Sequence, residues 1–97
     1  MMYLTFHEEA ESEVDEVARY YESRSFGLGA SFLDTIEKAI EEILARPTAY
    51  QLVSKDVRRK LLGRFPYSFL YVIEEDVIRV IAVAHQKRRP KYWSNRK

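Results

Sequence analysis

The sequence lacks cysteine, and its two histidines lie far apart in the chain. The absence of thiols excludes disulfides and thiolate chemistry, and two isolated imidazoles do not supply the donor set of a transition-metal site, so we expect no metal or other cofactor. No run of about 18 apolar residues is present, and the start MMYLTFHEEAE has neither the basic nor the apolar region of a signal peptide. We therefore expect a cytoplasmic protein that neither enters a membrane nor is exported.

Glycine and proline are also scarce, with three residues of each among 97, whereas 46% of the chain is hydrophobic and 13% is aromatic. This composition predicts one compact domain over residues 1–97, which buries roughly 60 to 65% of the surface that the unfolded chain exposes. No repeat or low-complexity segment interrupts it.

The net charge of +1 conceals a segregation of charge along the chain. Residues 1–48 hold 11 acidic and 4 basic side chains, whereas residues 49–97 hold 4 acidic and 12 basic ones. Clustered lysine and arginine raise the local potential, so the second half is expected to meet an anionic partner. The alternative is that an acidic part of the molecule simply complements a basic part.

The first half of the chain has the periodicity of a short strand followed by two helices. YLTF at residues 3–6 is typical of an edge strand. From Glu8 an acidic first turn, with Thr5 or His7 as the N-cap, opens a helical stripe formed by Ala10, Val14, Val17, Ala18 and Tyr21. After the turn SFGLGAS at residues 25–31, a second stripe contains Phe32, Leu33, Ile36, Ile40, Ile43 and Leu44. This helix is expected to end at Arg46, because Pro47 disfavours helical geometry in the residue before it. The two helices would form a hairpin.

The second half alternates as β-strands do. YQLV (50–53) and VRRKLL (57–62) are candidate strands, and YSFLYVI (67–73) and VIRVIAVAH (77–85) are stronger ones, joined by the acidic link EED as a hairpin. Alternation along the last strand predicts one face formed by Val77, Arg79, Ile81, Val83 and His85. The opposite face would hold Ile78, Val80, Ala82 and Ala84. We expect the helical hairpin to cover this second face, with Arg79 and His85 on the less covered one. The expected fold class is α+β, an N-terminal strand and an α-helical hairpin packed on an antiparallel β-sheet.

This order of elements, together with RRKLLGRFPYSFLY and VIAVAHQKRRPKYWSNR, resembles the RelE/ParE superfamily of small bacterial toxins. The resemblance extends from the helix at Ala10 to Arg96. Its most specific pieces are FPY at residues 65–67, the strand DVIRVIAVAH, and the ending in which His85 is followed by Arg, Pro and Trp before a last Arg. FPY and this ending look more similar to the ParE-like, plasmid-stabilisation branch.

The resemblance implies a toxin that is encoded beside an antitoxin and neutralised by it. ParE-like members poison DNA gyrase, whereas RelE-like members cut messenger RNA in the ribosome. We predict a ParE-like toxin of a type II toxin–antitoxin system that binds gyrase and catalyses nothing. The alternatives are a RelE-like ribosome-dependent mRNA endonuclease, and a former toxin that only forms a repressor complex with its antitoxin. A homodimer, or a heterotetramer with the antitoxin, is possible under each hypothesis.

Under the endonuclease hypothesis, the candidate catalytic residues are His85, Arg58, Arg79 and Tyr92. Cleavage through the 2′-hydroxyl of RNA needs a base, an acid and cations for the charge that builds on phosphorus. An imidazole can serve as base or acid, guanidinium groups can hold phosphate by forked hydrogen bonds, and a tyrosine can carry a proton or stack on a base. The structural alternative for His85 is the cap of a central strand.

Under the binding hypothesis, the candidate contacts with antitoxin or target are Arg58, Arg79, Lys87, Arg88, Arg89 and Trp93. The hypothesis expects a hairpin whose uncovered face presents Arg58 and Arg79 to an acidic polypeptide, by strand addition or in a groove. Arg58 has the alternative of pairing with Asp56, Glu74 or Glu75, and Trp93 of packing the C-terminal segment on the sheet.

Overall fold

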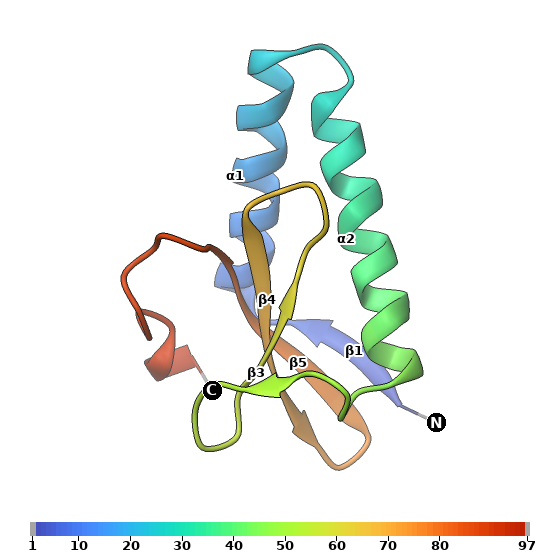
Figure 1. The fold of residues 1–97 in the computed structure, drawn as a ribbon, viewed down its shortest axis with the longest axis vertical. Helices are drawn as coiled ribbons and strands as arrows, with labels where there is room; N and C mark the ends of the chain where they lie inside the picture. The colour runs from blue at the N-terminus through green and yellow to red at the C-terminus, as the bar shows by residue number, and fades with distance from the viewer. Residues whose placement is uncertain (1, 97) are drawn as a thin grey trace.

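The structure, a computed structural model, describes residues 2–96 and contains two helices packed against one five-stranded sheet (Figure 1). Its elements in chain order are β1 (Tyr3–Phe6), α1 (Glu8–Arg24), α2 (Leu28–Ala45), β2 (Gln51–Leu52), β3 (Arg58–Leu61), β4 (Tyr67–Glu74), β5 (Val77–His85) and a 3₁₀ helix (Ser94–Arg96). The strand order is β1-β5-β4-β3-β2. The α+β class, the helical hairpin and the β4–β5 hairpin are confirmed. The sheet is mixed rather than antiparallel, because β1 pairs with β5 in parallel.

The N-terminal strand leads directly into α1 through a capped turn. The backbone N–H of His7 donates to the carbonyl oxygen of Val80, and the His7 imidazole Nδ1 accepts the N–H of Glu9 at 3.1 Å. A side-chain acceptor at this position satisfies one of the N–H groups that the first helical turn leaves without a partner. Of the two predicted N-cap residues, His7 is therefore the one used.

The tight turn between the helices depends on Glu22 and two glycines. Gly27 has a positive φ of 84°, and its N–H and that of Gly29 both donate to the Glu22 carboxylate, at 3.0 to 3.1 Å. A carboxylate of α1 thus caps the N-terminus of α2, where the helix dipole favours negative charge. At Gly29 an added Cβ would lie 2.6 Å from the carbonyl oxygen of Ala18, so only glycine lets the helices approach this closely.

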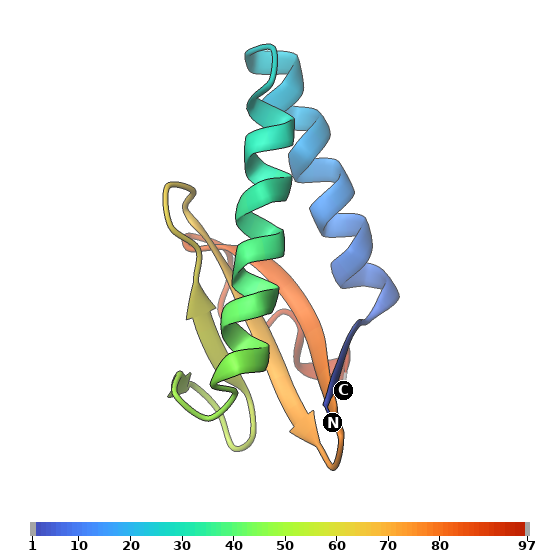
Figure 2. The same cartoon turned by 90° about the vertical axis from the view of Figure 1, so that its right-hand side faces the viewer.

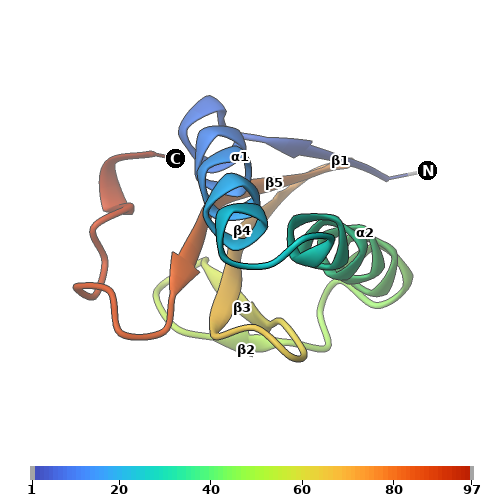
Figure 3. The same ribbon diagram turned by 90° about the horizontal axis from the view of Figure 1, so that it is seen from above.

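The sheet separates two apolar clusters, and α1 and α2 lie on one side of it with the C-terminal segment on the other (Figures 2 and 3). The buried residues on the helix side include Ala10, Val14, Phe32, Ile36, Ile43, Phe69, Tyr71, Ile78, Val80 and Val83. Those on the opposite side are Val57, Leu70, Val72, Ile81, Ala82, Ala84 and Trp93. The predicted stripes face the core, except that Leu33 and Leu44 are 42% and 37% exposed.

A β-bulge interrupts the pairing of β4 with β5. Leu70 pairs with Ala82 and Tyr71 pairs with Val80, which leaves Ile81 as an extra residue on β5. One extra residue reverses the alternation of side chains for the remainder of the strand. Ile81 and Ala82 consequently both belong to the cluster opposite the helices.

The bulge corrects the predicted faces of β5. Before it, Arg79 lies on the face opposite the helices, as predicted, because it pairs with Val72 of the second cluster. After it, the prediction is wrong. Val83 packs with the helices, and His85 shares that face, where its ring packs edge-on against Tyr67 at 5.1 Å. Alternation alone could not reveal the reversal, since both faces of this strand are apolar.

Candidate functional site

A cleft of about 230 Å³ lies between the face of the sheet opposite the helices and residues 86–96, which we call the strap. Its buried lining residues are the apolar Leu70, Ala84 and Trp93 and the polar Ser68. Its exposed lining is cationic, with Arg59 on β3 and Arg88, Arg89 and Lys91 on the strap. The cleft therefore combines a mainly apolar floor, which contains one serine, with a rim of positive charge.

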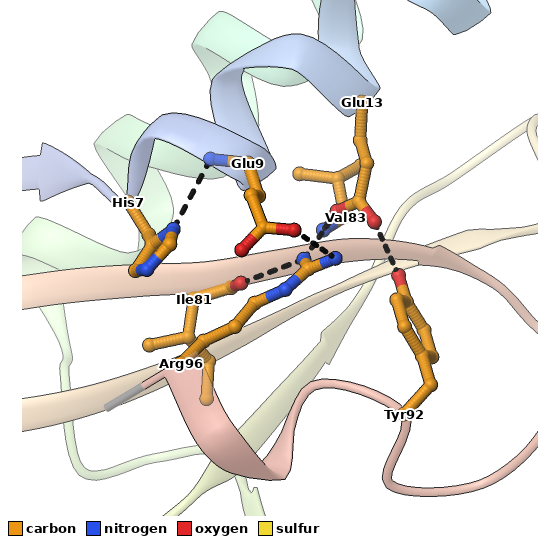
Figure 4. A network of polar contacts seen from close by, with 7 residues as sticks. All are labelled: His7, Glu9, Glu13, Ile81, Val83, Tyr92 and Arg96. Atoms are coloured by element: carbon orange, nitrogen blue, oxygen red, sulfur yellow. Dashed lines mark hydrogen bonds and ion pairs between the residues drawn. The ribbon is translucent and has the colours of Figure 1, made fainter.

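The strap is fastened to α1 by the carboxylate of Glu13 (Figure 4). This carboxylate accepts hydrogen bonds from the Tyr92 hydroxyl at 2.7 Å, from an Arg96 guanidinium nitrogen at 3.0 Å and from the N–H of Val83 at 2.9 Å. Arg96 also donates to the carbonyl oxygen of Ile81 at 3.1 Å. Helix, central strand and strap thus meet at one charged, largely buried contact.

The position of this contact follows from the length of β1. The pairing of β1 with β5 ends at Phe6 and Val80, so the edge of β5 continues beyond its neighbouring strand. Buried backbone groups need hydrogen-bond partners. The Glu13 and Arg96 side chains supply those partners to Val83 and Ile81 and take the place of a longer β1.

The Tyr92 ring lies between two cations. The guanidinium carbon of Arg88 is 3.9 Å from the ring centroid and that of Arg96 is 4.9 Å away. Burial raises the pKa of the Tyr92 hydroxyl well above its ordinary value, and so do its hydrogen bond to Glu13 and the Glu13 charge, although the two arginines act in the opposite direction. A phenol held neutral in this way does not exchange protons near neutrality. The predicted use of Tyr92 as a proton carrier is therefore unsupported by its surroundings.

His85 ends β5 and caps the turn that follows. Its Nδ1 accepts the backbone N–H of Lys87 at 3.0 Å, and its ring packs against Tyr67. This is the strand-capping arrangement that the sequence left open as the structural alternative. His85 also lines the cleft, as do Arg88, Arg89, Tyr92 and Trp93 among the predicted site residues.

Arg58 is the predicted site residue that the structure corrects most clearly. It pairs with Tyr71 and shares its face, so it lies on the helix side of the sheet rather than on the uncovered face. Its guanidinium donates to the carbonyl oxygens of Tyr50 at 2.8 Å and Thr48 at 3.2 Å. These bonds tie β3 to the loop after α2, so the contacts of Arg58 are structural.

The remaining predicted residues lie apart from the cleft. Arg79 is on the uncovered face, but six residues before His85 along β5, a separation of about 20 Å at the rise of a strand. Arg79 lines a separate, shallow hollow at the acidic β4–β5 turn. Lys87 is not among the residues that line the cleft. The structure therefore does not bring His85, Arg58, Arg79 and Tyr92 together in one place.

Sequence analysis missed Arg59, Glu13 and Arg96. Arg59 pairs with Leu70 and so occupies the face on which Arg58 was expected. The alternation of side chains along β3, once β3 is paired with β4 so that Arg59 lies opposite Leu70, identifies Arg59 as the arginine on this face. The contact between Glu13 and Arg96 joins residues 83 positions apart, and no local pattern signals it.

The described part of the chain holds no helix that is both long and apolar enough to cross a membrane. Comparison with curated proteins finds no match. Among solved structures, a chain described as "Chromosomal ParDE TA system from P. aeruginosa" superposes with a TM-score of 0.67 over 88% of this chain and 96% of that one. At 19% sequence identity this similarity shows a shared fold.

Residues 4–90 match the family model described as "ParE toxin of type II toxin-antitoxin system, parDE". The match extends from the second residue of β1 into the strap and includes the other four strands in full. Together with the predicted order of elements, it confirms the resemblance drawn from the sequence. The chain therefore belongs to the ParE toxin family of type II toxin–antitoxin systems.

Proposed function

We propose that this toxin acts in the cytoplasm by binding DNA gyrase, without catalysing a reaction, and that a cognate antitoxin neutralises it. The observation that carries the proposal is the scattering of the four residues that an endonuclease would need. Arg58 lies on the helix side of the sheet, and Arg79 lies on the opposite face near the β4–β5 turn. Catalysis of RNA cleavage requires such groups to converge within hydrogen-bond reach of one phosphate.

The polar atoms of the other two residues are already engaged. The Tyr92 hydroxyl donates to Glu13, and the His85 Nδ1 accepts the Lys87 N–H. Both interactions stabilise the strap and its connection to β5. They support a structural use of these side chains.

The surface favours binding to a protein. The cleft offers exposed guanidinium groups above a buried, mainly apolar floor that contains Trp93, and arginine and aromatic anchors are the residue types that dominate protein interfaces. The charge of the whole chain is only +1. Attraction to the long phosphate backbone of ribosomal RNA would therefore be confined to one face.

Two assays on the purified chain separate the hypotheses. Addition of the chain to gyrase and relaxed plasmid should inhibit supercoiling, whereas toe-printing of a translated transcript should reveal no new ends. The antitoxin, added in equal amount, should restore supercoiling. Fresh cuts within codons together with unimpaired supercoiling would overturn the proposal.

A further inference from the structure

The turn of the helical hairpin lies at one end of the molecule. Both helices continue past the sheet before they join, so residues 19–28, which we call the hairpin tip, form a protrusion (Figures 1 and 2). A protrusion can enter a hollow of another molecule without displacing any part of its own fold. The hairpin tip therefore has the shape of a contact surface.

The hairpin tip exposes aromatic and cationic side chains together. Phe26 is 98% exposed, more than any other large hydrophobic residue of the described chain, and Tyr20 is 54% exposed. The guanidinium carbon of the exposed Arg24 lies 5.9 Å from the centroid of the Tyr20 ring. One exposed apolar side chain is common on a protein surface. Phenylalanine, tyrosine and arginine on one protrusion, however, are the residue types that are enriched in protein interfaces.

An aromatic cluster supports the hairpin where it leaves the sheet. The ring centroid of Phe65 lies 4.9 Å from that of Tyr21 on α1 and 5.3 Å from that of Phe32 on α2. The Tyr67 ring lies 5.8 Å from that of Phe32. Phe65 and Tyr67 belong to the FPY segment, and neither lines the cleft. This segment therefore fixes the direction of the hairpin relative to the sheet.

The turn itself is held by its own hydrogen bonds. The Glu22 carboxylate accepts the N–H groups of Gly27 and Gly29, and the N–H of Leu28 donates to the carbonyl oxygen of Ser25 at 3.1 Å. Phe26 lies between these anchored residues. A side chain on an ordered backbone loses less conformational entropy on binding than one on a mobile loop.

The charge of the hairpin tip differs from that of the remaining hairpin. Of the 11 acidic side chains in residues 1–48, six lie in residues 8–16 and four in residues 34–42, which leaves Glu22 between them. The Glu22 carboxylate is occupied by backbone N–H groups, whereas Arg19 and Arg24 are exposed. The tip is therefore an apolar and cationic end on an acidic support.

This distribution of charge favours a compact pocket over an extended polyanion. A nucleic acid strand bound at the tip would continue along the acidic parts of α1 or α2, which repel phosphates. A pocket on a protein contacts the tip alone. Carboxylates at the edge of such a pocket would complement Arg19 and Arg24.

We propose that the hairpin tip is a second contact surface of this toxin, on which Phe26 enters an apolar pocket of the target protein and Arg24 pairs with a carboxylate at the edge of that pocket. The inference rests on the proposed function where it takes gyrase as the target, because it names the way in which the toxin holds that enzyme.

The experiment measures binding of the full chain, labelled with a fluorophore at its N-terminus, to purified gyrase by anisotropy. Phe26→Ala should weaken binding about tenfold to a hundredfold, the range for a phenylalanine side chain that leaves water. Its melting midpoint should stay unchanged, because Phe26 is 98% exposed. Tyr3→Ala is the matched control, since Tyr3 is also an exposed aromatic residue, at 63%, but lies on β1 away from the tip.

Arg24 tests the charge of the pocket. Arg24→Ala should weaken binding about twofold to fivefold, as the loss of an exposed ion pair does. Arg24→Glu should weaken it further, because like charges repel, and the difference between the two variants should shrink at high salt. Binding by Arg24→Glu that equals or exceeds that of Arg24→Ala would contradict the acidic edge.

Three results would overturn the inference. The first is equal binding of gyrase by Phe26→Ala and by the unmodified chain, and the second is an equal loss in Tyr3→Ala. The third is a dimer of the chain in sedimentation analysis that Phe26→Ala dissociates, which would assign the tip to a second copy.

Growth of cells that express the chain without antitoxin separates this inference from the gyrase proposal, because it does not depend on the identity of the target. Phe26→Ala should restore growth, whereas Tyr3→Ala should not. If the unmodified chain arrests growth but leaves supercoiling intact, and Phe26→Ala restores growth, the gyrase proposal fails while this inference stands. If Phe26→Ala inhibits gyrase as strongly as the unmodified chain, this inference fails while the gyrase proposal stands.

Discussion

Replacing Glu13 by glutamine should destabilise the protein far more than the same change at Glu9. The Glu13 carboxylate accepts hydrogen bonds from Tyr92, Arg96 and Val83. Glutamine can keep its oxygen toward Val83 and Arg96 and donate its NH₂ group to the Tyr92 hydroxyl, but it then no longer accepts the Tyr92 proton and it carries no charge. Arg96, whose side chain is 9% exposed, then loses the charge of its closest partner.

The magnitude follows from burial and from the kind of bond. Removal of one partner of a fully buried ion pair costs about 3 to 5 kcal/mol, and a single hydrogen bond to a charged group contributes about 1.5 to 3 kcal/mol. The Glu13 side chain is 16% exposed, and glutamine retains one acceptor. We therefore expect a loss of about 2 to 4 kcal/mol in the free energy of unfolding. In a domain of this size, such a loss lowers the melting midpoint by roughly 10 to 20 °C.

Glu9→Gln is the matched control on the same helix. The Glu9 side chain is 62% exposed and its carboxylate lies 3.7 Å from the Arg96 guanidinium. An exposed pair of this kind contributes less than about 1 kcal/mol. Both substitutions remove one negative charge that lies close to Arg96, but only Glu13→Gln disturbs buried hydrogen bonds.

Urea unfolding measures the difference. The chain has one tryptophan, Trp93, which lies in the strap, so its fluorescence reports the strap while circular dichroism at helical wavelengths reports α1 and α2. Glu13→Gln should lower the midpoint by both measures, with the fluorescence change at the same or a lower urea concentration. Equal midpoints for Glu13→Gln and Glu9→Gln would refute the role assigned to Glu13.

Three further predictions concern the core. Gly29→Ala should lower the free energy of unfolding by about 1 to 3 kcal/mol by overpacking, because its Cβ would lie 2.6 Å from the Ala18 carbonyl oxygen. Gly63→Ala is the control, since a Cβ there has nothing within 4 Å and should leave the thermal midpoint nearly unchanged. Equal midpoints for the two variants would contradict this prediction. Trp93→Ala should cost about 3 to 5 kcal/mol in chemical denaturation, as for other buried aromatic side chains, and a loss below about 1 kcal/mol would show that the strap does not depend on it. Burial is the main cause that raises the pKa of the Tyr71 hydroxyl from 10.0 to about 12, while the charge of Arg58 acts in the opposite direction. The unfolded chain therefore releases this proton at a lower pH than the folded chain, and the free energy of unfolding falls as the pH rises between these two values. Tyr71→Phe should flatten that part of the stability curve, and an unchanged slope would contradict the assignment.

The elements of this fold could be predicted from the sequence because their signals are local. Each signal determines a nearby element or its end. The apolar stripe from Ala10 to Tyr21 predicts the first helix, Pro47 ends the second, and the acidic link before Val77 separates the last two strands. The helix boundaries were predicted to within a few residues for this reason. The parallel pairing of β1 with β5 was not predicted, because it joins segments more than 70 residues apart and no turn between them fixes their direction.

The functional face was harder to predict, and the physical reason is the bulge at Ile81. A prediction based on strict alternation is correct for Arg79 and reversed for Val83 and His85. The resemblance to the toxin superfamily points to Arg58, although it is Arg59 that lies opposite Leu70 on the uncovered face. Of the predicted contact residues of the strap, Arg88, Arg89 and Trp93 line one cleft, whereas Lys87 lies outside its lining.

The claim that this toxin binds rather than cleaves is tested most directly by growth of cells that express a His85→Asn variant without the antitoxin. Asparagine can accept the Lys87 N–H as an Asx turn, so it keeps the cap that His85 provides, but it has no imidazole to transfer a proton. We expect this variant, with an unchanged melting midpoint, to arrest growth as the unmodified chain does. A folded His85→Asn variant that leaves growth unaffected, while the unmodified chain arrests it, would contradict the claim.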